Sequence, residues 1–121
     1  MDSSKREYEI ECFAKELEVE IGEIANLFAS YFEEMKEEIL EMKDSVVQSD
    51  WSMLKRIIHN VKGVSANLNV SDVFEAAAAL DARLKDNETS DAGVHVEKII
   101  GLINNAEVEI SKFFLEKGIT L

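Results

Sequence analysis

The side chain best placed to do chemistry in this sequence is the imidazole of His59, which precedes Lys62 by three residues and Gly63 by four. At near-neutral pH an imidazole is largely uncharged, so one ring nitrogen keeps a lone pair that can attack phosphorus. A phosphoryl group on that nitrogen would carry on the order of two negative charges, and a lysine one helical turn away could offset them. The spacing therefore favours a histidine that carries a phosphoryl group, with Lys62 tuning the adduct.

This chemistry requires a helix that presents His59 to solvent, and the surrounding sequence predicts one over residues 51–68. At about 100° per residue, the apolar residues of this helix fall in one stripe whose centre lies near Val61. His59 lies roughly 150° from that centre and is expected to face outward. The predicted core stripe consists of Leu54, Ile57, Ile58, Val61, Val64, Ser65 and Leu68.

The residues that share the outward face with His59 are small or basic, which suits both an anion and a docking partner. Gly63 costs roughly 1 kcal/mol relative to alanine in a helix interior, so its presence suggests that something approaches the backbone there. Three cations, Lys55, Arg56 and Lys62, gather around one point of a strongly acidic chain. We therefore predict that Lys62 and Gly63 support the phosphoryl group, and that the partner docks on Ser52, Lys55, Arg56 and Ala66.

Other chemistry has less support. The sequence has no Gly-rich phosphate loop, no Cys/His metal cluster and no serine nucleophile elbow. A di-metal bundle enzyme would need Glu-x-x-His pairs, but the positions three before the two histidines are Arg56 and Ala92. No metal site is predicted. A lone helical histidine is more often structural or idle than reactive, and this is our interpretation of His95, which has no Lys-Gly partner.

The composition restricts the partners and the compartment. The 121 residues carry a net charge of −12, which argues against nucleic acid because binding to a phosphate backbone needs a basic footprint. The single cysteine, Cys12, cannot form an internal disulfide, and we expect a buried or half-buried thiol in a reducing compartment. The chain has no signal-like segment and no run of about 18 apolar residues. We therefore expect a cytoplasmic protein without a membrane segment.

The fold class is predicted to be all-α. The chain has no proline and only five glycines, so little prevents long helices joined by short connections. Apolar residues spaced by three and four predict helices over about residues 20–46 and 51–68, from 71 or 72 to about 85, and after 93. We expect an up-and-down antiparallel four-helix bundle over about residues 20–115, within a single domain over residues 1–121.

A short additional helix over residues 1–18 is expected to cap this bundle. Asp2, Ser3 or Ser4 could cap its start, and its predicted inward anchors are Tyr8, Phe13 and Leu17. For later helices, Ser49 or Asp50 is a natural N-cap of the third, and Ser71 or Asp72 of the fourth.

Residues 59–68, His-Asn-Val-Lys-Gly-Val-Ser-Ala-Asn-Leu, resemble the signature of histidine-containing phosphotransfer (HPt) domains, which centres on H-x-x-K-G followed by small residues and an aliphatic. Asp50 lies where that family often has an acidic residue that opens the helix, and Leu54 falls at its usual aliphatic position. Leu80-Asp81 falls where the family commonly has Leu-Glu or Leu-Gln, whose polar side chain can reach the active histidine. The resemblance covers most of residues 20–115, with motif detail in 50–81.

The sequence departs from the family pattern at several positions. Ile58 replaces a usual alanine, Asn60 a usual Thr or Ser, Val64 a usual small residue and Asn69 a usual glycine. Asp81 is one methylene shorter than the usual side chain, so two interpretations stay open: it supports the phosphoryl site by reaching His59, or it is a solvated helix acid. None of these exchanges removes the nucleophile.

The resemblance implies a phosphoryl group on the outer imidazole nitrogen of His59 and response-regulator receiver domains as partners, with a hybrid sensor kinase as a further candidate. The chain would be a phosphocarrier in a two-component phosphorelay and not an enzyme. It would bind no cofactor, and Mg²⁺ and the acidic catalytic pocket are expected on the partner receiver. We expect a monomer, and the Met1 start favours a free-standing shuttle over a module of a larger kinase.

A second class of function stays open. The chain could be an acidic helical adaptor that binds a partner on an apolar groove without phosphotransfer, in which case His59 is incidental. The two functions differ in whether His59 takes up phosphate.

Overall fold

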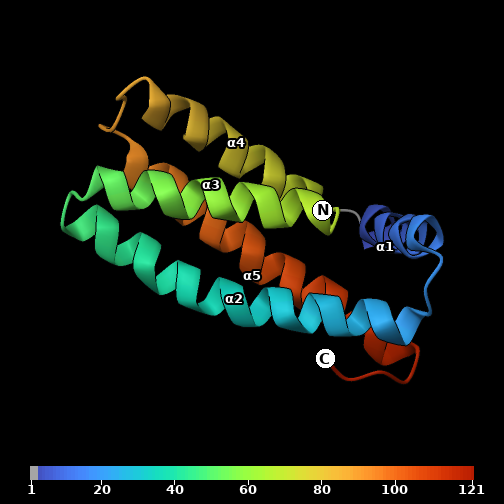
Figure 1. Cartoon of the computed structure of the whole chain (residues 1–121). Helices are drawn as coiled ribbons and strands as arrows, with labels where there is room; N and C mark the ends of the chain where they lie inside the picture. Colours follow the sequence, from blue (N-terminus) through green and yellow to red (C-terminus); the bar gives the residue numbers. More distant parts are fainter. Residues whose placement is uncertain (1–2) are drawn as a thin grey trace.

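The computed structural model describes residues 3–121, with side chains from Lys5 onward. It contains α1 (Ser3–Leu17), α2 (Ile21–Val47), α3 (Trp51–Asn67), α4 (Ser71–Lys85) and α5 (Ala92–Glu116). Helices α2 to α5 run alternately up and down, and α1 lies at one end of them (Figure 1). α3 packs on α2 and α4, while α5 packs on α4 and α2, so the four helices close into a bundle; α1 contacts α5. The predicted all-α bundle with an additional N-terminal helix is confirmed.

The core forms because apolar residues spaced by three and four give each bundle helix one apolar face. In α3 the buried residues are Leu54, Ile57, Ile58, Val61 and Ser65, while Val64 and Leu68 pack against the core partly buried. This is the predicted stripe. Its polar member, Ser65, has its hydroxyl oxygen 2.7 Å from that of Tyr31 on α2, so both buried hydroxyls have a partner. Burial raises the pKa of Tyr31 to about 12 although the Ser65 hydrogen bond lowers it.

The first four helices end in the same way, through a residue with a left-handed backbone. These residues are Glu18, Ser49, Asn69 and Asn87, with φ between 53° and 62°. A left-handed residue after the last turn lets the chain leave the helix. Glycine is favoured at such a position, and asparagine tolerates it better than most residues. The exchange of the family's usual glycine for Asn69 is therefore compatible with the turn that the chain makes there.

One of the predicted helix caps is confirmed. The Asp50 side chain at the start of α3 accepts a hydrogen bond from the Met53 backbone N–H at 3.1 Å. For α4 the prediction is wrong: Val70 occupies the N-cap position, and Ser71 and Asp72 lie inside the first turn. There the Asp72 carboxylate accepts two hydrogen bonds from Arg6 at 2.9 and 2.7 Å. For α1, Ser3 lies within the helix and Asp2 lies outside the described residues.

The predicted inward face of α1 is partly wrong. Phe13 is buried, but Tyr8 is 68% exposed and Leu17 is 46% exposed. The buried face runs instead through Arg6, Ile10 and Phe13, which follow one another by four and three residues. An apolar pattern could not identify this face because one of its members is an arginine.

Two further expectations concern the thiol and the membrane. Cys12 is free and partly buried, as predicted. None of the helices within residues 3–121 combines the length and apolar character needed to cross a membrane.

Candidate functional site

His59 lies on α3, on the side away from the core, and 69% of its side chain is exposed. The residues before it, Ile57 and Ile58, are buried, so the helix places the imidazole outward by its own periodicity. Nδ1 of the imidazole lies 4.0 Å from Oδ2 of Asp81 on α4. The predicted outward direction of His59 is confirmed.

Asp81 is the centre of a small charged cluster beside the imidazole. Its side chain is 5% exposed, and its Oδ2 atom accepts a hydrogen bond from Lys62 of α3 at 2.7 Å. The same oxygen lies 3.0 Å from Nζ of Lys85, one turn further along α4. Its 4.0 Å distance from His59 is too long for a hydrogen bond. Asp81 is thus neither a solvated acid nor hydrogen-bonded to the histidine: it pairs with two lysines.

The charge state of Asp81 follows from these contacts. Burial raises its pKa, but the hydrogen bonds from Lys62 and Lys85 and their positive charges outweigh this effect and hold the pKa below the ordinary value of 3.8. The carboxylate is therefore ionised at neutral pH. Sequence reasoning did not assign a role to Lys85, although its position four residues after Asp81 is a usual spacing for an intrahelical ion pair.

An open depression of about 350 Å³ lies between α3 and α4 next to the imidazole. It is lined by Ser52, Lys55, Arg56, His59, Asp81 and Lys85. Three of the four residues predicted for partner docking thus border the same hollow as His59. The fourth, Ala66, is exposed on α3 beyond Gly63. The depression combines three cations with one carboxylate, which suits an anionic group.

Gly63 lies on the exposed side of α3, one turn after His59. A Cβ atom built at this position would meet nothing within 4 Å, so no packing inside the described chain requires a glycine. The space above the Gly63 backbone is open to solvent. This geometry is compatible with the predicted close approach of another molecule.

The residue after His59, Asn60, contacts α2. Its side-chain amide donates hydrogen bonds to Glu34 at 2.6 Å and to Glu38 at 3.1 Å. Burial raises the pKa of Glu38, and nearby glutamates such as Glu41 add to this, while the Asn60 hydrogen bond lowers it. Sequence reasoning missed this contact because Glu34 and Glu38 lie 26 and 22 residues away from Asn60 and on another helix.

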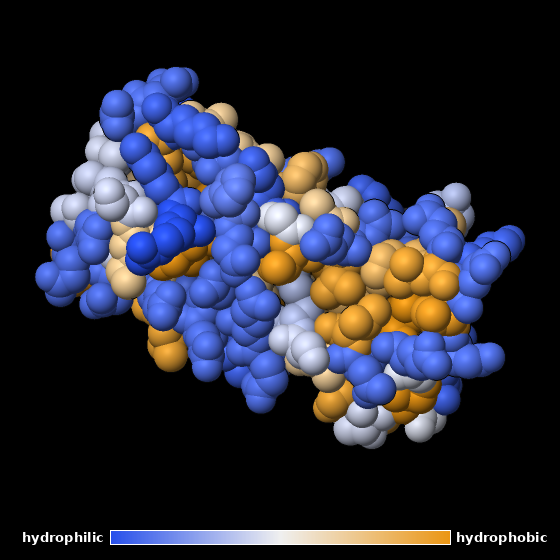
Figure 2. Space-filling view, viewed as in Figure 1, coloured by the Kyte–Doolittle hydropathy of each residue, from blue (hydrophilic) through white to orange (hydrophobic). Residues whose placement is uncertain are grey.

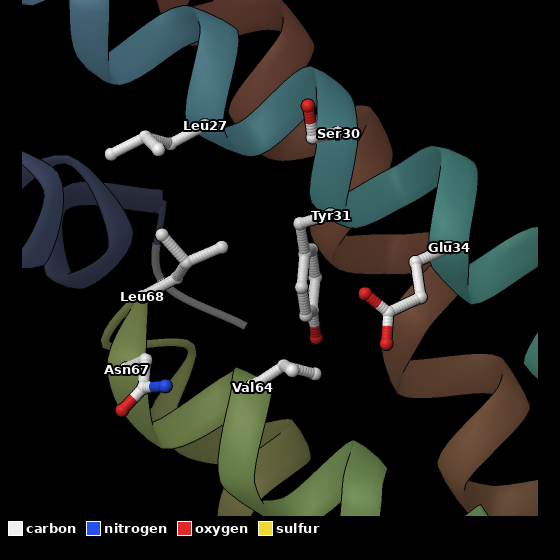
Figure 3. A pocket seen from close by; sticks show the side chains of 7 residues that line it. All are labelled: Leu27, Ser30, Tyr31, Glu34, Val64, Asn67 and Leu68. Carbon is white, nitrogen blue, oxygen red and sulfur yellow. The ribbon is translucent and has the colours of Figure 1, made fainter.

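A groove between α2 and α3 lies further along, toward the α1 end of the bundle. It has a volume of about 210 Å³ and is lined by Leu27, Ser30, Tyr31, Glu34, Val64, Asn67 and Leu68. Leu27 and Leu68 lie on its opposite walls, and Tyr31 reaches from α2 toward Val64 (Figure 3). Hydrophobic surface gathers at this end of the molecule, whereas the opposite half is mostly hydrophilic on the same face (Figure 2). Leu27 is 43% exposed, so this apolar residue of α2 is only partly covered.

The second histidine has a structural environment. Nε2 of His95 lies 3.3 Å from Asp91, whose carboxylate also accepts hydrogen bonds from Arg83 at 2.9 and 2.7 Å. These contacts tie the loop between α4 and α5 to both helices, in line with the structural interpretation of His95. No cluster of three or more His, Cys, Asp or Glu side chains able to hold a metal ion occurs within residues 3–121.

Comparison with known proteins gives one match. The family model of the Hpt domain matches residues 26–109, which is more than half of the chain and includes α3, α4 and the cluster around His59. No curated protein and no solved structure matches the chain.

Proposed function

The chain belongs to the Hpt domain family, whose members are phosphocarrier modules of two-component phosphorelays, and we propose that it carries the phosphoryl group on His59. The observation that supports this assignment is the exposure of the imidazole, 69%, beside the Asp81–Lys62–Lys85 cluster. His95, by comparison, is 29% exposed and lies against Asp91.

The proposed reaction is a direct exchange of one bond to phosphorus for another. Nε2 of His59 attacks the phosphorus of a phosphoaspartate on a receiver domain; the N–P bond forms while the P–O bond breaks, and the receiver keeps a carboxylate. In the reverse transfer, the carboxylate of a receiver aspartate attacks the phosphorus of the phosphohistidine. The N–P bond breaks, and the neutral imidazole is restored. We assign the attack to Nε2 because Nδ1 is the ring nitrogen that lies 4.0 Å from Asp81.

The residues of this chain would position and neutralise the phosphoryl group. Lys62 is one turn from His59 and can approach the phosphoryl oxygens, while Gly63 leaves room for the partner's backbone or side chains. We propose that the partner docks over Ser52, Lys55, Arg56 and Ala66. Mg²⁺, which we place on the partner receiver, would neutralise charge on the phosphoryl oxygens.

The experiment that tests this proposal is phosphoryl transfer from a panel of phosphorylated receiver domains in the presence of Mg²⁺. We expect the chain to become an acid-labile phosphoprotein with at least one receiver. The His59→Gln variant should take up no label, and the His95→Gln variant should be labelled like the parent. Equal labelling of the parent and His59→Gln would show that the assignment is wrong.

The adaptor function is favoured by one observation, the apolar groove of Leu27, Val64 and Leu68 between α2 and α3. An adaptor would bind its partner there whether or not His59 carries phosphate. Binding that is lost in Leu27→Ser but retained in His59→Gln, together with no transfer from any receiver, would support this function instead.

The remaining expectations are part of the same proposal. They are a monomer, a cytoplasmic location, and receiver domains or a hybrid sensor kinase as partners. Sedimentation of the purified chain tests the first of these directly.

A further inference from the structure

The positive charge of Lys62 is already engaged in the structure. Its Nζ atom lies 2.7 Å from Oδ2 of Asp81, and the lysine side chain is only 25% exposed. A phosphoryl group on His59 would therefore meet a lysine that is hydrogen-bonded to another anion. For Lys62 to neutralise the phosphoryl group, it must give up this hydrogen bond.

Asp81 cannot easily lose both of its cations. Its carboxylate is 5% exposed, and an ionised carboxylate without a partner is costly at a buried position. A phosphoryl group nearby would add two negative charges, roughly, to the same region. If Lys62 were the only cation, its movement to the phosphoryl group would leave Asp81 unpaired.

Lys85 provides the second cation. Its Nζ atom lies 3.0 Å from the same Oδ2 atom, and it belongs to the same helix as Asp81, so the pair does not depend on Lys62. Its side chain is 63% exposed, which leaves its long stem free to adjust. The two other cations of the depression, Lys55 and Arg56, make no ion pair with Asp81; Nζ of Lys55 lies 3.4 Å from the Asn87 side chain instead.

We propose that Lys85 is a second functional lysine of this site, which keeps Asp81 paired while Lys62 moves to the phosphoryl group on His59. Within the cluster of Asp81, Lys62 and Lys85, two lysines and one carboxylate leave one surplus positive charge, which is lost when Lys85 is removed. The exchange rests on the proposed function, because it describes the phosphorylated state of His59.

The test uses the full chain and phosphoramidate, a small phosphodonor that needs no partner protein. Attack by His59 breaks the P–N bond of phosphoramidate, forms the bond to the imidazole nitrogen and releases ammonia. After removal of the donor, the half-life of the phosphohistidine is followed by ³¹P NMR. Without a receiver and its Mg²⁺, we expect a lysine that pairs with the phosphoryl oxygens to stabilise the adduct through a charge-assisted contact and so to slow its loss.

We expect Lys85→Gln to shorten this half-life by about threefold or more, within the range that a partly buried charge contact allows. Lys85→Arg should keep a half-life close to that of the parent. Lys112→Gln, which removes an exposed cation of α5 outside the cluster, should leave it unchanged. Thermal unfolding must show that each variant is folded at the temperature of the measurement, so that a folding defect is not mistaken for the effect.

The decisive comparison adds Asp81→Asn, which removes the anion that holds Lys62. In the Asp81→Asn/Lys85→Gln double variant Lys62 is free, so the half-life should return to that of Asp81→Asn alone. Adding Asp81→Asn to Lys62→Gln should not restore the half-life of the phosphohistidine, because the lysine that contacts the phosphoryl group is then missing.

The outcomes separate the two proposals. If the parent takes up no phosphoryl group on His59, the proposed function fails. If the parent is labelled and Lys85→Gln has the parent half-life, only the role of Lys85 is wrong. A double variant that decays as fast as Lys85→Gln alone would also overturn the exchange, because Lys85 would then act only as a nearby charge.

Discussion

The imidazole of His59 lies beside a carboxylate that it does not contact closely. Oδ2 of Asp81 is 4.0 Å from Nδ1, but 2.7 and 3.0 Å from the two lysines. In the structure the lysines therefore bind the acid and not the histidine. At the scale of single residues, the chemistry of the site depends on how these three charges are shared once a phosphoryl group arrives.

The first residue-scale prediction concerns Gly63. Because a Cβ atom there meets nothing within 4 Å, Gly63→Ala should raise the free energy of unfolding by about 1 kcal/mol, the usual gain from glycine to alanine in a helix. The same methyl group would occupy the space that a partner needs, so phosphoryl transfer with the receiver should slow several-fold. Urea unfolding and transfer kinetics measure the two effects.

Gly101 of α5 is a matched control for this change, since a Cβ atom there also meets nothing within 4 Å. Gly101→Ala should stabilise the fold without slowing transfer. If both variants transfer at the parent rate, the open space at Gly63 has no role in docking.

The second residue-scale prediction concerns pH. The pKa of Asp81 in the folded chain is lower than the ordinary 3.8, because the hydrogen bonds and charges of Lys62 and Lys85 outweigh burial, which raises it. Such a group stabilises the fold above its ordinary pKa, and this contribution is lost as the pH falls below 3.8 through the lowered folded value. Between about pH 5 and pH 2, the parent should therefore lose more stability than Asp81→Asn. Parallel losses in urea unfolding across this range would contradict the ion pairing.

At the scale of elements, a polar contact of Arg6 contributes to the placement of α1. Arg6 is 4% exposed, donates two hydrogen bonds to Asp72 at the start of α4, and lies 3.9 Å from Glu109 of α5. Burial lowers the pKa of Arg6, but the contacts with Asp72 and Glu109 raise the pKa by more than burial lowers it. The guanidinium therefore stays charged. Together with Ile10 and Phe13, this arginine attaches α1 to the bundle.

We predict that Arg6→Ala destabilises the chain by roughly 3 kcal/mol, because it leaves the largely buried Asp72 and Glu109 without their cation. Backbone amides of α1 should exchange with solvent faster, while those of α3 should change little, since α3 packs against α2 and α4. Hydrogen exchange followed by NMR measures both. Adding Asp72→Asn should recover part of the loss; a loss below about 0.5 kcal/mol would mean that apolar contacts alone hold α1.

At the scale of the whole molecule, the uneven distribution of charge matters more than its sum. The chain carries a net charge of −12, yet the depression beside His59 is lined by Lys55, Arg56 and Lys85. A local basic face on an acidic protein orients an acidic partner and repels it elsewhere. This charge pattern suits the acidic pocket expected on a receiver domain.

A variant with the charge of this basic face reversed tests its role at the scale of the whole molecule. Lys55→Glu/Arg56→Glu should lower kcat/KM for transfer from a phosphorylated receiver, and the difference from the parent should narrow as salt is added, because added ions screen exposed charges beyond about 8 Å at physiological strength. The control Lys98→Glu/Lys112→Glu makes the same change in net charge at exposed positions of α5. An equal loss of kcat/KM in both variants would mean that only the net charge of the chain matters, and not the position of the basic face beside His59.

The sequence by itself determined those features that depend on local periodicity. Residues spaced by three and four gave the bundle helices and the outward direction of His59, and Asp50 gave the cap of α3, because each of these depends on neighbours within a turn or two. The Lys62 and Gly63 positions relative to His59 follow from the same geometry. The resemblance to HPt domains rests on this segment, and the family match agrees with it.

Only the tertiary structure decided which side chains meet across helices. It brought Lys62 of α3 to Asp81 of α4, buried Arg6 against Asp72, and left Leu27 in an open groove between α2 and α3. Such contacts depend on how packed helices are rotated and offset against each other, which no single helical pattern contains. For that reason the sequence could place His59 on the surface, whereas the packing of α3 on α4 decided which charges surround it.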